Sequence, residues 1–265
     1  MFAFLQRTAF IALLIAWFSG LASISEAQLR TESLRPGVQG IIPMGPLDEM
    51  EDMLSAGDAG QKVDLLMRLG VEPEIAKVTV EELVPGERIQ LRSVREPGHP
   101  QFGAAYLPGF RGCFLYLLEE FHNGDGKPAW RATDHRTVDC WDGDASLEVM
   151  TLRRADSDDL VFHHVNVGHG SGYLEDQTQV FAILGGKLVK VLETTDLLSV
   201  EEVGTGRTTE HRSTFLRFPG RLYEETRTTN VDDVPKTVER RYWRWSPRED
   251  KFVAGTFVST LAPHR

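Results

Sequence analysis

Residues 159–193, DLVFHHVNVGHGSGYLEDQTQVFAILGGKLVKVLE, carry the strongest β-sheet signal in the chain. Apolar residues fill Val180–Leu184, Gly185-Gly186 follows, and a second apolar run occupies Leu188–Leu192. Two adjacent glycines suit a tight hairpin turn, because both can adopt positive φ without a Cβ clash. The stretch therefore predicts an antiparallel hairpin, preceded by a further strand over Leu160–Val167.

The two-residue turn also fixes which residues pair across the hairpin. The expected pairs are Val180 with Val191, Ala182 with Val189, and Ile183 with Leu188. The first two pairs share one face and the third lies on the other, since successive side chains alternate along a strand. Both faces are apolar, which predicts a strand pair covered on both sides.

Strand-like segments continue through residues 110–265, separated by turn signals such as Pro219-Gly220 and Ser246-Pro247. Their spacing predicts a mainly β fold, an antiparallel meander arranged as a barrel or a sandwich. The expected strands are Cys113–Glu120, Ala129–Cys140, Ser146–Leu152, Leu160–Val167, Thr178–Leu184, Lys187–Glu193, Leu198–Val203, Arg212–Phe218, Arg221–Arg227, Thr237–Trp245 and Phe252–Phe257.

Residues 46–109 have a different character and predict a small helical and irregular N-terminal segment. A helix is expected from Pro46, with Leu47, Met50 and Leu54 at spacings of three and four. A second is expected over Gln61–Leu69, while Glu74–Val84 fits either a helix or a strand. The breakers in Pro85–Gly109 indicate irregular structure.

The first 27 residues resemble a secretory signal peptide. Arg7 precedes an apolar run over Ala9–Phe18, and Ser25-Glu26-Ala27 has the small-x-small pattern of a cleavage site. We therefore expect an exported protein, periplasmic or secreted, that starts at Gln28 and has a flexible leader over residues 28–45. After signal removal no segment is long and apolar enough to span a bilayer.

The charge of the chain narrows the classes of partner. The formal net charge is −10 at pH 7. An acidic exported chain is a poor candidate for binding nucleic acid or anionic membranes. No nucleic-acid partner is therefore expected.

Cys113 and Cys140 are the only cysteines of the chain. In an exported protein two cysteines are expected to pair. They fall on consecutive predicted strands around the Asn123–Pro128 turn, so they lie directly or diagonally opposite each other on one face. The sequence offers no Cys-His motif for the alternative of a nucleophilic thiol.

Three histidines lie near a glycine-rich loop. A zinc site needs ligands that converge on one point, but His163 and His164 are adjacent on a strand and point to opposite faces. His169 and Ser171 lie in the loop Gly168–Gly172, which lacks the Lys and Thr of a P-loop and the glycines of a hydrolase elbow. We expect no bound metal and no cofactor, and we keep His169 and Ser171 as ligand-facing candidates.

Two further patterns could carry binding. Asn123-Gly124-Asp125-Gly126 resembles part of a calcium loop, but Phe121 and Ala132 stand where ligands are needed, which favours a polar turn. Trp243 and Trp245 share one strand face, whereas Tyr242 shares the other with Arg240 and Arg244. The two tryptophans are candidates for a binding platform, although core packing is favoured for them.

The sequence thus favours a non-catalytic envelope or secreted binding domain, with an unidentified protein or glycan as its partner. The alternative is a secreted hydrolase with a site near the His163–Ser171 loop. An enzyme needs polar groups that converge in a concave pocket, whereas a binding domain can use a flat surface.

Overall fold

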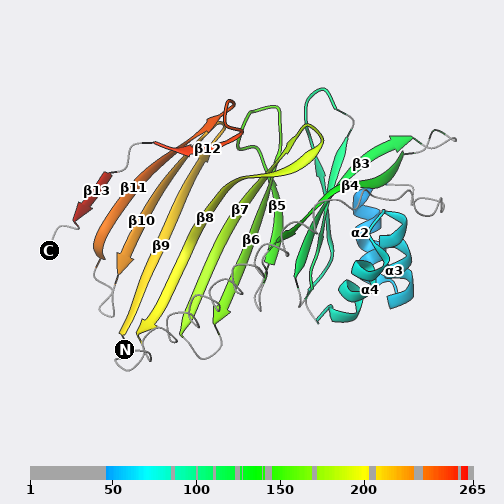
Figure 1. Cartoon of the computed structure of the whole chain (residues 1–265), viewed down its shortest axis with the longest axis horizontal. Helices are drawn as coiled ribbons and strands as arrows, with labels where there is room; N and C mark the ends of the chain where they lie inside the picture. The colour runs from blue at the N-terminus through cyan, green and yellow to red at the C-terminus, as the bar shows by residue number, and fades with distance from the viewer. Residues whose placement is uncertain are drawn as a thin grey trace, which may run out of the picture. The chain divides into compact units, whose positions relative to one another are not determined.

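The three-dimensional structure is a computed structural model. It describes residues 46–261 except 85–86, 100, 110–111, 123–125, 127, 139, 141–144, 169–171, 203–206, 230–234 and 256–257. The described residues form three helices and two antiparallel sheets (Figure 1). The prediction of a mainly β fold with a small helical segment near the N-terminus is therefore confirmed. The proposed signal peptide and the leader lie outside the described residues.

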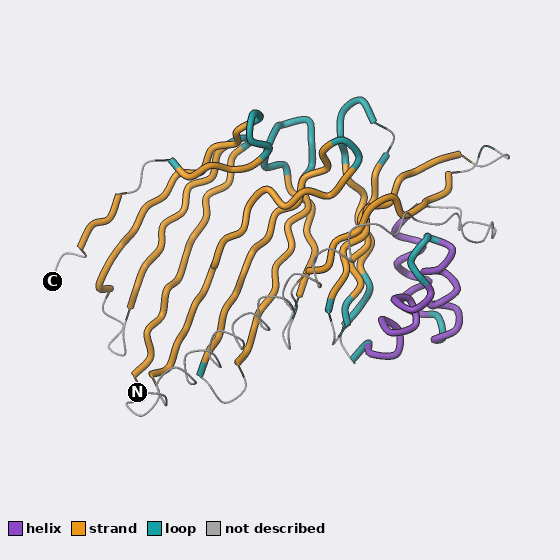
Figure 2. The backbone as a smooth tube through the Cα atoms, viewed as in Figure 1, coloured by secondary structure: helices purple, strands orange, loops and turns teal. Residues whose placement is uncertain are grey.

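The helices occupy the first part of the described chain (Figure 2). They are α2 (Leu47–Ala56), α3 (Ala59–Arg68) and α4 (Pro73–Glu82). The side chain of Asp58 accepts a hydrogen bond from the Gln61 backbone N–H, and the side-chain oxygen of Gln61 accepts one from the Asp58 backbone N–H, forming a capping box at the start of α3. Pro73 begins α4, where a missing N–H costs no intrahelical bond. The ambiguous segment Glu74–Val84 is thus helical up to Glu82.

A four-stranded sheet follows the helices and has the order β1-β2-β3-β4. Its strands are β1 (Gln90–Val94), β2 (Phe102–Leu107), β3 (Cys113–His122) and β4 (Pro128–Val138). The expectation of irregular structure over Pro85–Gly109 is wrong, because β1 and β2 lie within that range. Pro97 and Gly98 belong to the connection between these two paired strands, and Gly103 lies within β2.

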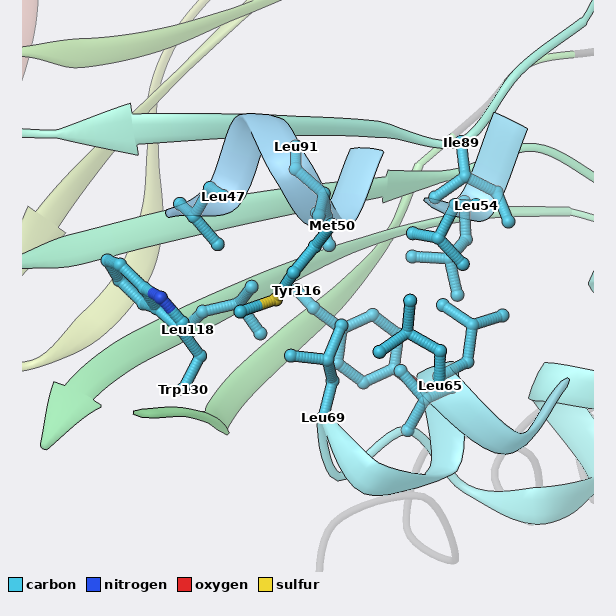
Figure 3. Close-up of a cluster of buried hydrophobic side chains, with 14 of the residues drawn as sticks. Leu47, Met50, Leu54, Leu65, Leu69, Ile89, Leu91, Tyr116, Leu118 and Trp130 are labelled. Carbon is cyan, nitrogen blue, oxygen red and sulfur yellow. The ribbon is translucent and has the colours of Figure 1, made fainter. Parts of the chain in front are cut away.

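The three helices and one face of this sheet enclose the first hydrophobic core (Figure 3). Met50 of α2 and Leu69, which caps the C-terminus of α3, lie beside Tyr116 and Leu118 of β3 in this core, and all four are fully or almost fully buried. The hydroxyl of Tyr116 donates a hydrogen bond to the carboxylate of Glu72, just before α4. A buried Tyr hydroxyl needs such a partner, so this bond anchors the helices on the sheet.

The second sheet has nine strands in the order β12-β11-β10-β9-β8-β7-β6-β5, with β13 also paired to β11. Its strands are β5 (Ala145–Met150), β6 (Asp159–Gly168), β7 (Tyr173–Leu184), β8 (Lys187–Glu202), β9 (Arg207–Phe218), β10 (Arg221–Thr229), β11 (Pro235–Ser246), β12 (Lys251–Ala254) and β13 (Val258–Leu261). From β5 to β12 each strand pairs with the next one along the chain, as a meander requires.

The central hairpin is the one expected, apart from one register error. Gly185 and Gly186 have φ values of 58° and 74°, and Ala182 pairs with Val189 as predicted. Val180, however, pairs with Leu192 rather than Val191, because the register shifts between Val180 and Phe181. A bulge adds an unpaired residue to one strand, and an alternation pattern does not reveal it.

The predicted strands Lys187–Glu193 and Leu198–Val203 are parts of one strand, β8. The polar residues Thr194–Asp196 interrupt the apolar pattern between the two predicted strands. A second register shift, between Asp176 and Gln177 of β7, lies opposite this segment. The strand therefore continues through its polar middle with a bulge instead of ending there.

The hairpin β7–β8 is buried on both faces next to its turn, together with the neighbouring part of β6, which confirms the expectation of double coverage. On one face Phe162 and Phe181 pack against side chains of the four-stranded sheet, including Leu115 and Leu117. The opposite face forms a separate core. Its buried members are Leu152, Val161, Val180, Ala182, Val191, Leu192, Leu222 and Phe252.

A buried ion-pair network also joins the two sheets. The Arg153 guanidinium, 2% exposed, donates to the fully buried carboxylate of Asp159 at the start of β6. Its other nitrogen donates to Glu96, just after β1, at 2.9 Å. The backbone nitrogens of Leu152 and Arg153 donate to Asp159 as well, at 3.1 and 2.9 Å. The buried charges are thus fully paired, as charges removed from water must be.

Cys113 and Cys140 lie at disulfide-bonding distance, with their Cα atoms 5.9 Å apart. This separation falls in the expected range for a disulfide, roughly 4.4–6.8 Å. Cys113 pairs with Val138, so Cys140 lies two residues beyond the directly opposite position, as the diagonal arrangement predicted. The bridge closes the β3–β4 hairpin at the end away from its turn.

Candidate functional site

Of the four ligand-facing candidates selected from the sequence, the structure describes Trp243 and Trp245. His169 and Ser171 lie outside the described residues. Trp243 is half-buried, packs against the core that contains Leu222, and donates its indole N–H to Glu224 at 2.9 Å. Trp245 packs on Phe252, with ring centroids 5.5 Å apart. Both tryptophans therefore take part in core packing, the alternative that the sequence favoured.

His163 and His164 point to opposite faces of β6, as expected. His164 is fully buried and stacks on Phe162, with ring centroids 5.6 Å apart. His163 contacts Thr178 of β7 through Nδ1, at 2.7 Å from the hydroxyl oxygen. The same hydroxyl lies 2.5 Å from a carboxylate oxygen of Asp196 on β8. Three neighbouring strands thus bring His163, Thr178 and Asp196 together.

The donor and the acceptor of each hydrogen bond in this triad follow from the chemistry of the three side chains. The Asp196 carboxylate can only accept, so the single Thr178 proton goes to it. The Nδ1 atom of His163 must then carry the proton that it donates to the Thr178 oxygen. Thr178 is only 3% exposed, so this hydroxyl has no path to a substrate in the observed arrangement. The triad orders the sheet and does not form an accessible nucleophile.

The pKa values of two carboxyl groups near the triad, those of Asp176 and Glu175, are shifted by their surroundings. Burial, reinforced by the nearby charge of Asp196, raises the pKa of Asp176. On the other face of β7, burial alone would raise the pKa of Glu175, but hydrogen bonds from Tyr173 and Gln177 outweigh it and lower that pKa. The hydrogen bond to Glu175 in turn raises the pKa of Tyr173 to about 12. These shifts arise within hydrogen-bonded networks of the sheet surface.

A shallow hollow of about 440 Å³ lies beside the first helix. Leu47, Leu91 and Trp130 form its apolar wall, and Arg92 lies at its rim. Arg92 is already engaged by the carboxylate of Glu51 at 2.7 Å. The hollow therefore offers apolar contact but few polar groups that are not already committed to the protein itself.

The most distinctive exposed surface lies on β9, β10 and β11, the amber and orange strands in Figure 1. Strand pairing places alternate residues of these strands on one face, which we call the outer face. The residues of the outer face are Glu210, Arg212, Thr214, Leu216 and Phe218 on β9, Arg221, Tyr223, Glu225, Arg227 and Thr229 on β10, and Val238, Arg240, Tyr242 and Arg244 on β11.

Large apolar and aromatic side chains stand open on this face. Leu216, Phe218 and Tyr242 are 54%, 58% and 53% exposed. The rings of Tyr223 and Tyr242 lie 5.1 Å apart at an angle of 58°. The opposite face of the same strands contributes Leu222 and Trp243 to a core. One face of β9–β11 thus contributes to a core, and the other presents large apolar groups to solvent.

The sequence contained part of this signal. Tyr242, Arg240 and Arg244 were expected on one face of their strand, and the strand pairing confirms that they share it. The binding candidates selected from the sequence, Trp243 and Trp245, lie on the opposite face of the strand. Nothing in an alternating pattern states which face another layer will cover, so the exposed face was missed.

Comparison with protein-family models, with curated proteins and with solved structures finds no match to this chain. In the part of the chain that the structure describes, no group of three His, Cys, Asp or Glu side chains is placed to hold a metal ion. No helix among the described residues is long and apolar enough to cross a membrane.

Proposed function

We propose that this protein is an exported, non-catalytic binding domain whose partner docks on the outer face of β9–β11. The observation that carries the proposal is the exposure of more than half of Leu216, Phe218 and Tyr242 on a strand face that no described layer covers. Tyr, Phe and Arg are enriched at the centres of protein interfaces, and the outer face carries five arginines, two tyrosines and one phenylalanine.

Export is the part of the proposal that rests on the first 27 residues. The two cysteines at disulfide-bonding distance support it, because disulfides persist in oxidising compartments. Mass spectrometry of the protein from its own host should find a mature N-terminus at Gln28. An intact residue 1–27 segment on soluble protein from the cytoplasm would contradict export.

Binding is tested by affinity capture from an envelope extract with the full mature chain as bait. Wild type and a Phe218→Ser, Tyr242→Ser double variant should show the same thermal unfolding, since both side chains are exposed. The wild type should retain a partner that the double variant loses. Equal capture by both proteins would show that the outer face is not the binding site.

The alternative, a secreted hydrolase, makes a different prediction with the same proteins. It places the site near His163–Ser171, so His169→Ala would abolish turnover and the outer-face double variant would keep it. Among the described residues of that region, the hydroxyl of Thr178 is buried between His163 and Asp196, and Ser171 lies outside the described residues.

A further inference from the structure

Two arginines lie directly opposite each other on the outer face. Arg221 of β10 pairs in register with Arg244 of β11, and both side chains are exposed. Neither makes an ion pair or a side-chain hydrogen bond with any described residue. Like charges at directly opposed positions of a sheet destabilise it. The fold thus tolerates an uncompensated pair of positive charges at this position.

A second arginine pair on the same face provides a built-in comparison. Arg212 of β9 lies opposite Arg227 of β10, but each is paired with a carboxylate, and the one beside Arg227 is shared with Arg240. Arg212 is 3.0 Å from Glu210, and Arg227 is 2.8 Å from Glu225. The sheet therefore supplies counter-charges for one pair and leaves the other without them.

The surroundings of Arg221 and Arg244 indicate what kind of counter-charge fits. Phe218 is the neighbour of Arg221 on β9, and the Tyr223–Tyr242 pair lies in the next row. The outer face carries five arginines and two glutamates, a surplus of three positive charges on a chain whose net charge is −10. This local reversal of sign favours an anionic partner at this face.

All the basic residues of the outer face are arginines. A guanidinium binds a carboxylate through two parallel hydrogen bonds, whereas a lysine acts as a point charge. Attraction to a bilayer depends on the number of charges and accepts either residue. Arginine beside Phe and Tyr is typical of the centre of a protein interface.

We propose that the outer face docks an acidic protein segment, with carboxylates seated between Arg221 and Arg244 and an apolar side chain packed on Leu216 and Phe218. This proposal rests on the proposed binding function and names the class of partner. It is consistent with the acidic remainder of the chain, because that remainder would repel the same partner elsewhere.

A photo-crosslinking amino acid at Tyr242 of the full chain, expressed in its host, tests the proposal. The expected adduct is a protein whose cross-linked segment is rich in Asp and Glu, identified by mass spectrometry. Adding Arg221→Glu and Arg244→Glu should reduce the yield of the adduct roughly tenfold, because the two new carboxylates repel the carboxylates of the partner segment. Raising the salt from about 50 mM to about 500 mM should reduce it several-fold, since exposed charges are screened.

Two matched controls separate charge from position. Arg68→Glu with Lys77→Glu changes the net charge equally on the helices, where both side chains are exposed, and should leave the adduct unchanged. The crosslinker at Met53, 50% exposed on α2, should give no such adduct.

The other outcomes overturn the proposal in distinguishable ways. An adduct with a lipid, a glycan or a basic protein segment would reject the acidic partner while leaving the binding function in place. The absence of any adduct at Tyr242 would reject both the partner class and the outer face as the binding site. An adduct that persists in the charge-reversal variant would show that Arg221 and Arg244 do not select the partner.

Discussion

The strand pairs β6–β7 and β9–β10 belong to the same sheet, yet they meet very different surroundings. Phe162 of β6 is fully buried between the sheets, whereas Phe218 of β9 is 58% exposed. Both residues lie in well-paired antiparallel strands. Strand propensity therefore explains why each segment is a strand, but coverage by another layer decides what each face does.

The difference extends to how the two regions handle charge. Near β6, Arg153 and Asp159 are buried and satisfied on every side by hydrogen bonds. On β10, Arg221 is exposed and has no counter-charge among the described residues. A buried charge has to be paired within the fold, while an exposed one can be left for solvent or a partner. Unpaired charges that could bind a partner are therefore less costly to stability on the uncovered face than in the core.

Phenylalanine truncation in the two regions gives the largest expected contrast. Phe162→Ala should lower the free energy of unfolding by about 4 kcal/mol, because it removes a buried ring and leaves a cavity. Phe218→Ala should change it by less than about 0.5 kcal/mol, because the ring is solvent-exposed. Urea denaturation of the oxidised protein at neutral pH measures both. Similar losses would mean that another layer covers the outer face.

The amino-acid sequence predicts the doubly covered region well. In Val180–Leu192 the strands, the glycine turn and the burial of both faces are as the sequence predicts. The bulge near Phe181 is the one feature that the sequence did not predict. Bulges depend on how a whole strand twists against its neighbour, and no local residue pattern encodes them. The same limitation hid the continuity of β8 through Thr194–Asp196.

The exposed region was predicted less completely for a physical reason. The faces of Tyr242 and Trp243 follow from simple alternation. The opposition of Arg221 and Arg244 depends on the register between β10 and β11, which shifts near Thr228. A candidate site assembled across strands therefore appears only once the pairing is known.

The disulfide gives the next largest effect and concerns the covered side of the molecule. Replacing Cys113 and Cys140 together by Ala should lower the free energy of unfolding by about 3 kcal/mol, because the open chain gains conformational freedom when unfolded. The double variant should still bind through the outer face. Denaturation with a thiol count on the native oxidised protein checks this, and two titratable thiols in wild type would show that the bridge does not form.

The smallest effect concerns the carboxylate of Asp158, at the junction between the sheets. It accepts hydrogen bonds from the backbone N–H and the guanidinium of Arg95, at 3.0, 3.0 and 2.9 Å. Burial alone would raise the pKa of Asp158, but these bonds and the charge of Arg95 outweigh it and hold the pKa below its usual value. Because the folded state favours the ionised form, Asp158 contributes stability at neutral pH.

The sign of the pH dependence follows from that shift. The contribution is complete above the unfolded pKa of about 3.9 and is lost as the pH falls through the lower folded pKa. Asp158→Asn should therefore cost about 1 kcal/mol at pH 7, a modest value because the Arg95 side chain is 68% exposed and water screens the pair. The cost should shrink as the pH drops below about 4.

Urea denaturation from neutral to acidic pH, with the exposed Asp156→Asn as control, measures this difference. The control should behave as wild type throughout. A cost for Asp158→Asn that stays constant down to low pH would mean that the carboxylate contributes through packing rather than charge. The junction would then resemble the covered core of β6 more than an ion pair, and the contrast in charge between the two regions would rest on Arg153 and Asp159 alone.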